Sequence, residues 1–211
     1  MEKIVLELPY WPPVSWLAMV WSRPVVALEA CEHFQKGSYR NRCHIAGPNG
    51  LQRLSIPLQK GKHQQSPIRE VRLAYDEPWQ QIHWRSIRTA YGNAPFFEHL
   101  SAEIEGFYSR RYTFLFDFNW DILQFLLRKI NWAGQLECTE VYQPGPLAFR
   151  DTVSPKSPTP PDGFRPAFYP QVFLERHGFL PDLSALDLLF CCGKQSTAVL
   201  EQSIPGFPHQ P

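Results

Sequence analysis

The sequence predicts an α/β fold, in which an N-terminal strand–helix–strand unit and a β-hairpin precede a helical second half. Three observations support this class. Short apolar runs separated by prolines fill the first 30 residues, a Gly/Pro/Asn cluster at 46–50 divides two strand-like runs, and residues 78–132 show helical periodicity. With 211 residues, of which 44% are hydrophobic, the chain can bury the core of one sizeable domain or of one domain with an appendage.

The first half of the chain supplies most of the expected strands. Pro9 ends the first strand, and Pro13 stands near the start of the helix expected over 14–21. The runs around the cluster AGPNG (46–50) predict the two arms of a hairpin. The strands expected in this half are 3–8, 25–30, 40–45, 52–58 and 68–75.

The second half is expected to be mainly helical. Pro78 and Gly92 bracket the first of these helices in the usual order of an N-terminal proline and a C-terminal glycine. Ser184 is a candidate N-cap for the last helix. The helices expected here are 78–93, 96–108, 119–132 and 183–192, with one late strand over 136–143. The expected organisation is a core over 1–143, a proline-rich connection or loop over 144–170, and a C-terminal helical segment over 171–211 that packs on the core.

Composition narrows the class of protein. The net charge of +1 and the pI near 7.7 argue against a general nucleic-acid binder, which would carry a basic excess. No apolar run reaches the length of a membrane span, and the N-terminus lacks the apolar region of a signal peptide. The five cysteines form no CxxC pair, so reduced thiols and a cytoplasmic location are expected.

A basic row is expected in the stretch FQKGSYRNRC and the residues after it. If 39–45 is a strand, Tyr39 and Asn41 share a face with Cys43 and Ile45, and Arg40, Arg42 and His44 share the opposite face. Guanidinium groups in a row suit a phosphate or carboxylate, which they bind through paired hydrogen bonds. The alternative is a solvated basic face, or arginines paired with nearby acids.

Those acids are Glu29 and Glu32, which precede the basic stretch. They could form a general acid–base pair, or they could neutralise Lys36, Arg40 or Arg42. Glu29, Cys31 and His33 would share one strand face, but residues two apart have Cα atoms about 6.5–7 Å apart, which is loose for a thiol–imidazole bond.

His83 is the candidate proton shuttle, with Ser86 one helical turn further on. The alternative is a helix-face histidine with a local hydrogen bond. Five histidines are scattered without HxH, HExxH or CxxC spacing, so no metal site is assigned: His33, His44, His63, His83 and His99. GxGxxG and GxxxxGK[ST] are also absent, and no cofactor is assigned.

Several ordered blocks of the chain resemble the WbqC-like proteins of bacteria, whose members often accompany surface-polysaccharide genes. The blocks are LPYWPPVSWLAMV, FQKGSYRNRCHIAGPNGLQRLSIPL and WQQIHWRSIRTAYGNAPFFEHL. A later block, YPQVFLERHGFLPDLSALDLLF, is similar to the variant seen in Bacteroidetes-type bacteria. The family opens with a Gln-Pro-Tyr-Phe-Pro type stretch, and Leu8 stands here in place of the glutamine.

The resemblance implies a cytoplasmic enzyme that transfers an acyl or aminoacyl group to an amino sugar, by analogy with the genes that its members accompany. Alternatives are a hydrolase or lyase with the same polar cluster, and a non-catalytic protein that binds an anionic small molecule. The expected partner is an anionic or phosphorylated substrate, free or carrier-bound. The expected catalytic residues are His83, Glu29 and Glu32. The expected substrate-binding residues are Tyr10, Gln35, Lys36, Tyr39, Arg40, Asn41, Arg42, Ser86 and Tyr91.

Overall fold

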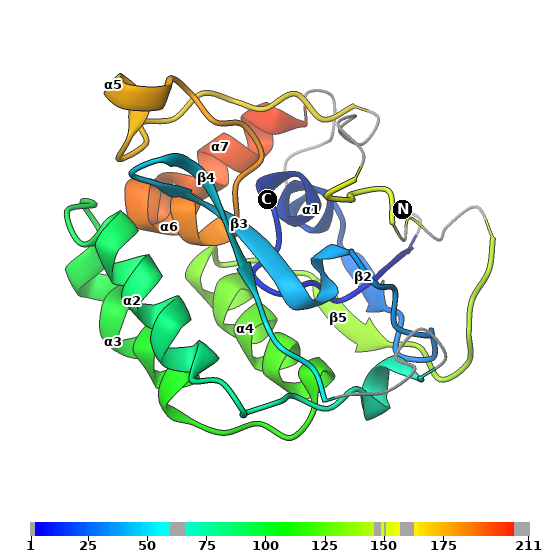
Figure 1. The fold of residues 1–211 in the computed structure, drawn as a ribbon. Coiled ribbons are helices and arrows are strands. Elements are labelled where there is room, and N and C mark those ends of the chain that lie inside the picture. The colour runs from blue at the N-terminus through cyan, green and yellow to red at the C-terminus, as the bar shows by residue number, and fades with distance from the viewer. Residues whose placement is uncertain (1–2, 60–65, 146–148, 150, 157–162, 205–211) are drawn as a thin grey trace.

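The computed structural model describes residues 3–59, 66–145, 149, 151–156 and 163–204. A three-stranded parallel sheet lies on one side of the molecule, with β2 (Val25–Leu28) between β1 (Ile4–Leu6) and β5 (Gln135–Cys138) (Figure 1). The register pairs Val5 with Ala27, and Ala27 with Glu137. β1 is buried throughout, as expected for a strand of a parallel sheet that is covered on both faces.

The α/β class is confirmed, and so is the N-terminal strand–helix–strand unit. Helix α1 (Val14–Trp21) joins β1 to β2 over the residues expected from the sequence. Its N-cap is Pro13, which provides no side-chain cap. α1 is apolar nearly all round and contacts α6 and α7, so it is a buried helix.

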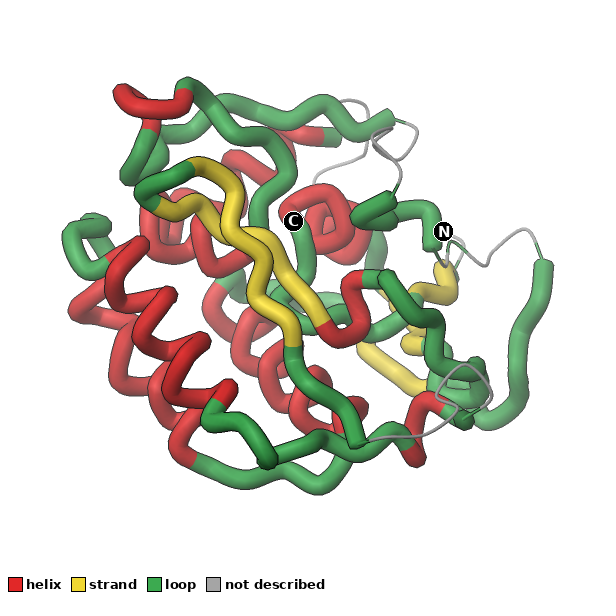
Figure 2. The backbone as a smooth tube through the Cα atoms, in the orientation of Figure 1, coloured by secondary structure: helices red, strands yellow, loops and turns green. Residues whose placement is uncertain are grey.

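The expected hairpin is also confirmed. β3 (Arg42–Gly47) and β4 (Gly50–Ser55) pair antiparallel, and their two-residue turn is Pro48–Asn49. Gly50 has φ +102°, a conformation that glycine adopts without a steric penalty. The hairpin crosses the front of the molecule, and α2 and α6 contact β3 (Figure 1, Figure 2).

Two strand predictions are wrong. Tyr39–Asn41 form a 3-10 turn, η1, capped by the Ser38 hydroxyl, so the strand begins only at Arg42. The expected strand 68–75 is instead a 3-10 turn, η3 (Ile68–Glu70), followed by two isolated bridges. Its neighbour along 57–59 includes Pro57, which has no N–H to donate to a ladder.

The helical second half follows the expected order. α2 (Trp79–Tyr91) and α3 (Phe97–Ser109) lie side by side, and α4 (Leu115–Lys129) lies between them and the sheet (Figure 1). α4 begins and ends earlier than expected. Asn131 has φ +51°, and the backbone N–H groups of Asn131 and Trp132 bond back to the last turn, which ends the helix.

The C-terminal segment contains α5 (Leu174–His177), α6 (Ala185–Cys192), η4 (Gly193–Gln195) and α7 (Ser196–Ser203). Ser184 caps α6 as expected, since its hydroxyl accepts from the Leu186 N–H. α6 packs on β3 and α3, and α7 packs on α1. Within the described parts of the chain, every helix is too short or too polar to cross a bilayer.

Candidate functional site

The carboxyl ends of the parallel strands carry buried polar side chains, at the sheet edge where α/β proteins place their ligands. Glu29 follows β2 and is fully buried. Its carboxylate accepts from the Thr139 hydroxyl at 2.5 Å, the Cys31 N–H at 3.0 Å and the Gln143 N–H at 3.0 Å. Glu29 therefore ties the loop after β5 to the end of β2.

Arg40 is the centre of a buried charge cluster. Its side chain is fully buried, with Nε and Nη2 donating to the two Glu32 oxygens at 2.6 and 2.7 Å. Nη1 donates to Asp151 at 2.8 Å. Burial alone would lower the pKa of Arg40, but the hydrogen bonds and charge of Glu32 outweigh it and raise that pKa. Arg40 is thus neutralised within the protein, as the alternative interpretation of Glu32 expected.

Glu7 adjoins this cluster from the end of β1 and is only 3% exposed. Burial raises its carboxyl pKa to about 7, and the Arg40 charge opposes that rise. The Asp151 N–H donates to Glu7 at 3.2 Å. Sequence reasoning missed both acids. Glu7 carried a signal, as the one acid within an apolar opening strand, whereas Asp151 lies in the proline-rich stretch and carried none.

His83 lies in an aromatic core and not on an open surface. It is 4% exposed, and its Nδ1 is 2.9 Å from the Tyr10 hydroxyl. That hydroxyl is 2.7 Å from the Tyr108 hydroxyl, to which Trp11 Nε1 donates at 2.9 Å. Burial lowers the pKa of His83 to about 4, and a hydrogen bond to the Ser55 backbone opposes this. The imidazole is therefore neutral at pH 7, and its neighbours hold it in place.

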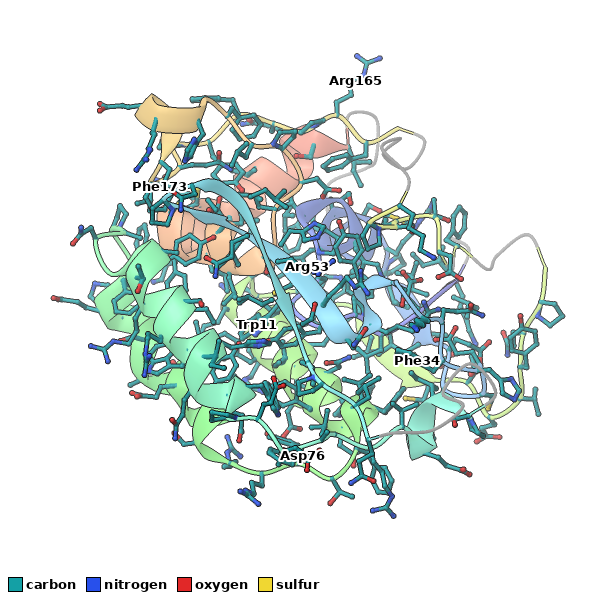
Figure 3. All side chains as sticks on the ribbon, in the orientation of Figure 1. Trp11, Phe34, Arg53, Asp76, Arg165 and Phe173 are labelled. Carbon is teal, nitrogen blue, oxygen red and sulfur yellow. The ribbon has the colours of Figure 1, made fainter. Side chains whose placement is uncertain are left out.

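The outer face of the hairpin carries a basic cluster that differs from the expected row. Arg42 and His44 are two residues apart on β3 and therefore share this face, and Arg53 of β4 pairs directly with His44. Figure 3 shows Arg53 near the centre of the view. Arg53 thus takes the place that Arg40 was expected to fill. Burial, followed by the charge of Arg53, lowers the pKa of Arg42, and burial with both arginines lowers the pKa of His44. The Tyr39 hydroxyl is 3.4 Å from His44 Nδ1.

Burial, followed by the charge of Asp182, raises the pKa of Tyr39, so one acid lies near the basic cluster. The ion pairs in the described parts of the chain involve neither Arg42 nor Arg53. The Nε of Arg42 is buried and finds no hydrogen-bond partner in the part of the chain that the structure describes. A buried guanidinium nitrogen without an acceptor is rare and calls for an explanation such as a bound water or ion. These side chains can therefore accept an anionic group.

The other predicted binding residues are dispersed. Gln35 and Lys36 are exposed in the loop before η1. Asn41 donates to the Ile56 carbonyl, and Ser86 accepts from Gln52 of the hairpin. Tyr91 is fully buried and accepts from the Ala46 N–H. The structure thus brings Tyr39 of η1 close to Arg42 of β3, leaves Gln35 and Lys36 in an exposed loop, and uses Asn41, Ser86 and Tyr91 in internal hydrogen bonds.

Among the described residues, no group of three or more histidine, cysteine or acidic side chains is placed to hold a metal ion. His63 lies outside the described residues. Cys31 Sγ contacts the Thr139 carbonyl at 3.5 Å, and His33 is exposed. No histidine ring in the described parts of the chain forms a hydrogen bond with the Cys31 thiol.

These features define an α/β protein with a buried arginine–carboxylate cluster at its sheet edge and a basic hairpin face. The model of the WbqC-like protein family matches residues 9–144, which is more than half of the chain. The chain therefore belongs to the WbqC-like family. Searches of curated proteins and of solved structures find no significant match.

Proposed function

We propose that the protein is a group transferase that holds the anionic part of its substrate on the outer face of the hairpin. The observation that carries this proposal is the basic cluster of Arg42, His44 and Arg53, in which Arg42 Nε is buried and finds no acceptor among the described residues. Arg42 and Arg53 are diagonal neighbours across the strand pair, because Arg42 pairs with Ser55 and His44 pairs with Arg53, and their like charges repel each other. A phosphate or carboxylate would offset that repulsion and give Arg42 its missing acceptor.

The transferred group is proposed to be an acyl or aminoacyl group, and the acceptor an amino sugar. This part rests on the surface-polysaccharide genes that WbqC-like proteins accompany. His44 is the best-placed general base, because its lowered pKa leaves the imidazole neutral near pH 7 beside both arginines. It would take the proton of the attacking amine while the new C–N bond forms and the bond to the leaving group breaks. His83 serves as a positioning residue, because it supports the backbone of Ser55 beneath the hairpin.

A non-catalytic anion-binding protein is the second candidate, and one observation favours it. The three groups expected to be catalytic all have partners inside the protein: Glu29 with Thr139, Glu32 with Arg40, and His83 with Tyr10. Both candidates require the same basic cluster, and they differ in whether a product forms.

The basic cluster, which both candidate functions require, is tested by measuring thermal shifts with inorganic phosphate, acetate, nucleotide sugars and acyl thioesters. A ligand at about 100 times its Kd stabilises by about 2.7 kcal/mol, which raises Tm by a few degrees. We expect Arg42→Gln and Arg53→Gln to abolish this shift. Arg85→Gln, which removes an exposed arginine of α2, should retain it. A shift that survives in the Arg42→Gln/Arg53→Gln double variant would place the anion elsewhere.

The two candidates are then separated by mass spectrometry of an amino-sugar acceptor incubated with the donor that binds. A transferase gives an acylated acceptor, and His44→Gln retains the thermal shift but loses the product. Binding without product, for every donor that causes a shift, would favour the binding protein.

A further inference from the structure

A concave region lies at the N-terminal end of α2, and no residue of the hairpin lines it. It is a pocket of about 560 Å³ formed by the loop before α2, the first turns of α2 and the end of α3. Asp76, which lines it, lies in the lower part of the view, whereas Arg53 lies near the centre (Figure 3). The volume is within the range of sites for small ligands, roughly 300–1,000 Å³.

Aromatic rings form the inner wall of this pocket. Tyr75, Trp79, Trp84 and Tyr108 all line it. Ring centroids are 6.0 Å apart for Tyr75 and Trp79, and 6.2 Å apart for Trp84 and Tyr108. Trp79 and Tyr108 are buried, and the hydroxyl of Tyr108 is fixed by Tyr10 and Trp11. The wall is therefore a set of aromatic rings that contacts inside the protein hold in place.

Acidic side chains surround these rings. Asp76, Glu77 and Glu105 line the pocket and are exposed, against a single lining guanidinium, that of Arg111. Among the described residues, none of the three carboxylates takes part in an ion pair. The positive N-terminus of α2 and the negative C-terminus of α3 both face this region, so their dipoles largely offset each other. The formal charge of the side chains that line the pocket is therefore negative, because three carboxylates face one guanidinium.

The protein already places a cation on this aromatic surface. The Arg111 guanidinium carbon is 4.9 Å from the centroid of the Tyr75 ring, within the range of a cation–π contact. Arg111 is exposed and comes from the segment after α3. It shows that the rim accepts a positive group, and it would compete with a ligand of the same charge.

From the aromatic wall, the excess of unpaired carboxylates and the seated guanidinium, we infer that this pocket binds a small organic ammonium ion. Aromatic rings with nearby carboxylates are the usual recognition of such ions, because the ring face is negative and the cation is only weakly hydrated. This inference does not depend on the anion-binding proposal, since the two sites share no residue.

The test is a titration of the full chain followed by tryptophan fluorescence, because Trp79 and Trp84 line the pocket. The probes are choline and 3,3-dimethylbutan-1-ol, its uncharged analogue of the same shape. We expect saturable quenching or enhancement by choline and at least a tenfold weaker response to the alcohol. Equal responses would show an apolar site and overturn the inference. No response to choline up to ~100 mM, at which even a 1 mM site is filled, would also overturn it.

Variants make the assignment specific. Glu105→Gln should weaken choline binding by about three- to tenfold through the loss of one nearby charge. Glu98→Gln, an exposed acid in the first turn of α3 outside the pocket, should leave it unchanged. Asp76→Asn removes a second lining carboxylate, in the loop before α2, and should also weaken choline binding.

Arg111→Gln gives the clearest test, because a cation site and an anion site predict opposite changes in ligand affinity for this variant. Removal of the competing guanidinium should tighten choline binding by about threefold. A site for anions would instead lose its only lining cation and bind inorganic phosphate more weakly. Weaker choline binding in Arg111→Gln, or equal binding in Glu105→Gln and Glu98→Gln, would refute an ammonium site.

Discussion

Glu7→Gln tests the buried charge cluster at the end of β1. Folding raises the pKa of this carboxyl from its ordinary value of 4.5 to about 7, chiefly by burial. Because the folded state favours the protonated acid, its stabilising contribution is complete below pH 4.5 and is lost as the pH rises through about 7. The difference between the two pKa values corresponds to roughly 3 kcal/mol, at about 1.4 kcal/mol per tenfold change in proton affinity.

Glutamine has the shape of the protonated acid and can still accept from the Asp151 N–H, which donates to Glu7 at 3.2 Å. We expect Glu7→Gln and the wild type to have similar free energies of unfolding near pH 4.5. Above about pH 8, the variant should be more stable by up to roughly 3 kcal/mol.

The assay is urea denaturation of both proteins across this pH range, with Glu140→Gln as the control for an exposed acid. The variant-minus-wild-type difference should rise with pH for Glu7→Gln and stay flat for the control. A difference that does not change with pH, or a variant that loses stability at high pH, would refute the reasoning. The second result would mean that attraction to Arg40 outweighs the cost of burying the charge.

Two further predictions concern buried groups of the candidate site. The pKa of His83 lies below its ordinary 6.5, at about 4, so its contribution to stability is present above pH 6.5 and is lost as the pH falls toward 4. The NMR resonances of its imidazole should therefore stay constant as the pH is lowered to about 5. An inflection of these resonances near pH 6.5 would instead show that the ring is solvated. Arg40→Met should lower the free energy of unfolding by about 3–5 kcal/mol, because it removes the guanidinium that pairs with the buried Glu32 carboxylate. The double variant Arg40→Met/Glu32→Leu should recover much of that loss in urea denaturation, and an equal loss would contradict the ion-pair explanation.

Most of the secondary structure could be predicted from the sequence wherever the pattern of apolar residues or the turn residues act locally. Helix 14–21 was predicted to the residue, and the hairpin followed from its turn cluster. Periodicity and turn chemistry act over a few residues, so a short stretch is enough to show them. The pairing of His44 with Arg53 was also within reach, since a two-residue turn at Pro48–Asn49 fixes that register.

The family resemblance was also visible in the sequence alone, because its blocks are long and ordered. The match over 9–144 includes the hairpin and α2, on which the predicted site depended. The sequence alone did not decide the role of each polar side chain. The same residue types suit a ligand site and an internal ion pair equally well.

Tertiary structure decided those roles through contacts between distant parts of the chain. Arg40 turns inward because Glu32 and Asp151, 111 residues away, converge on its guanidinium. His83 is neutral because burial lowers its pKa, and Tyr10, 73 residues before it, is one of the residues that lie against it. Burial and charge pairing depend on which segments meet in space, and a buried charge is stable only when its partner arrives with it. The residue types were therefore set by the sequence, and the fold alone determined which of them remain open to a ligand.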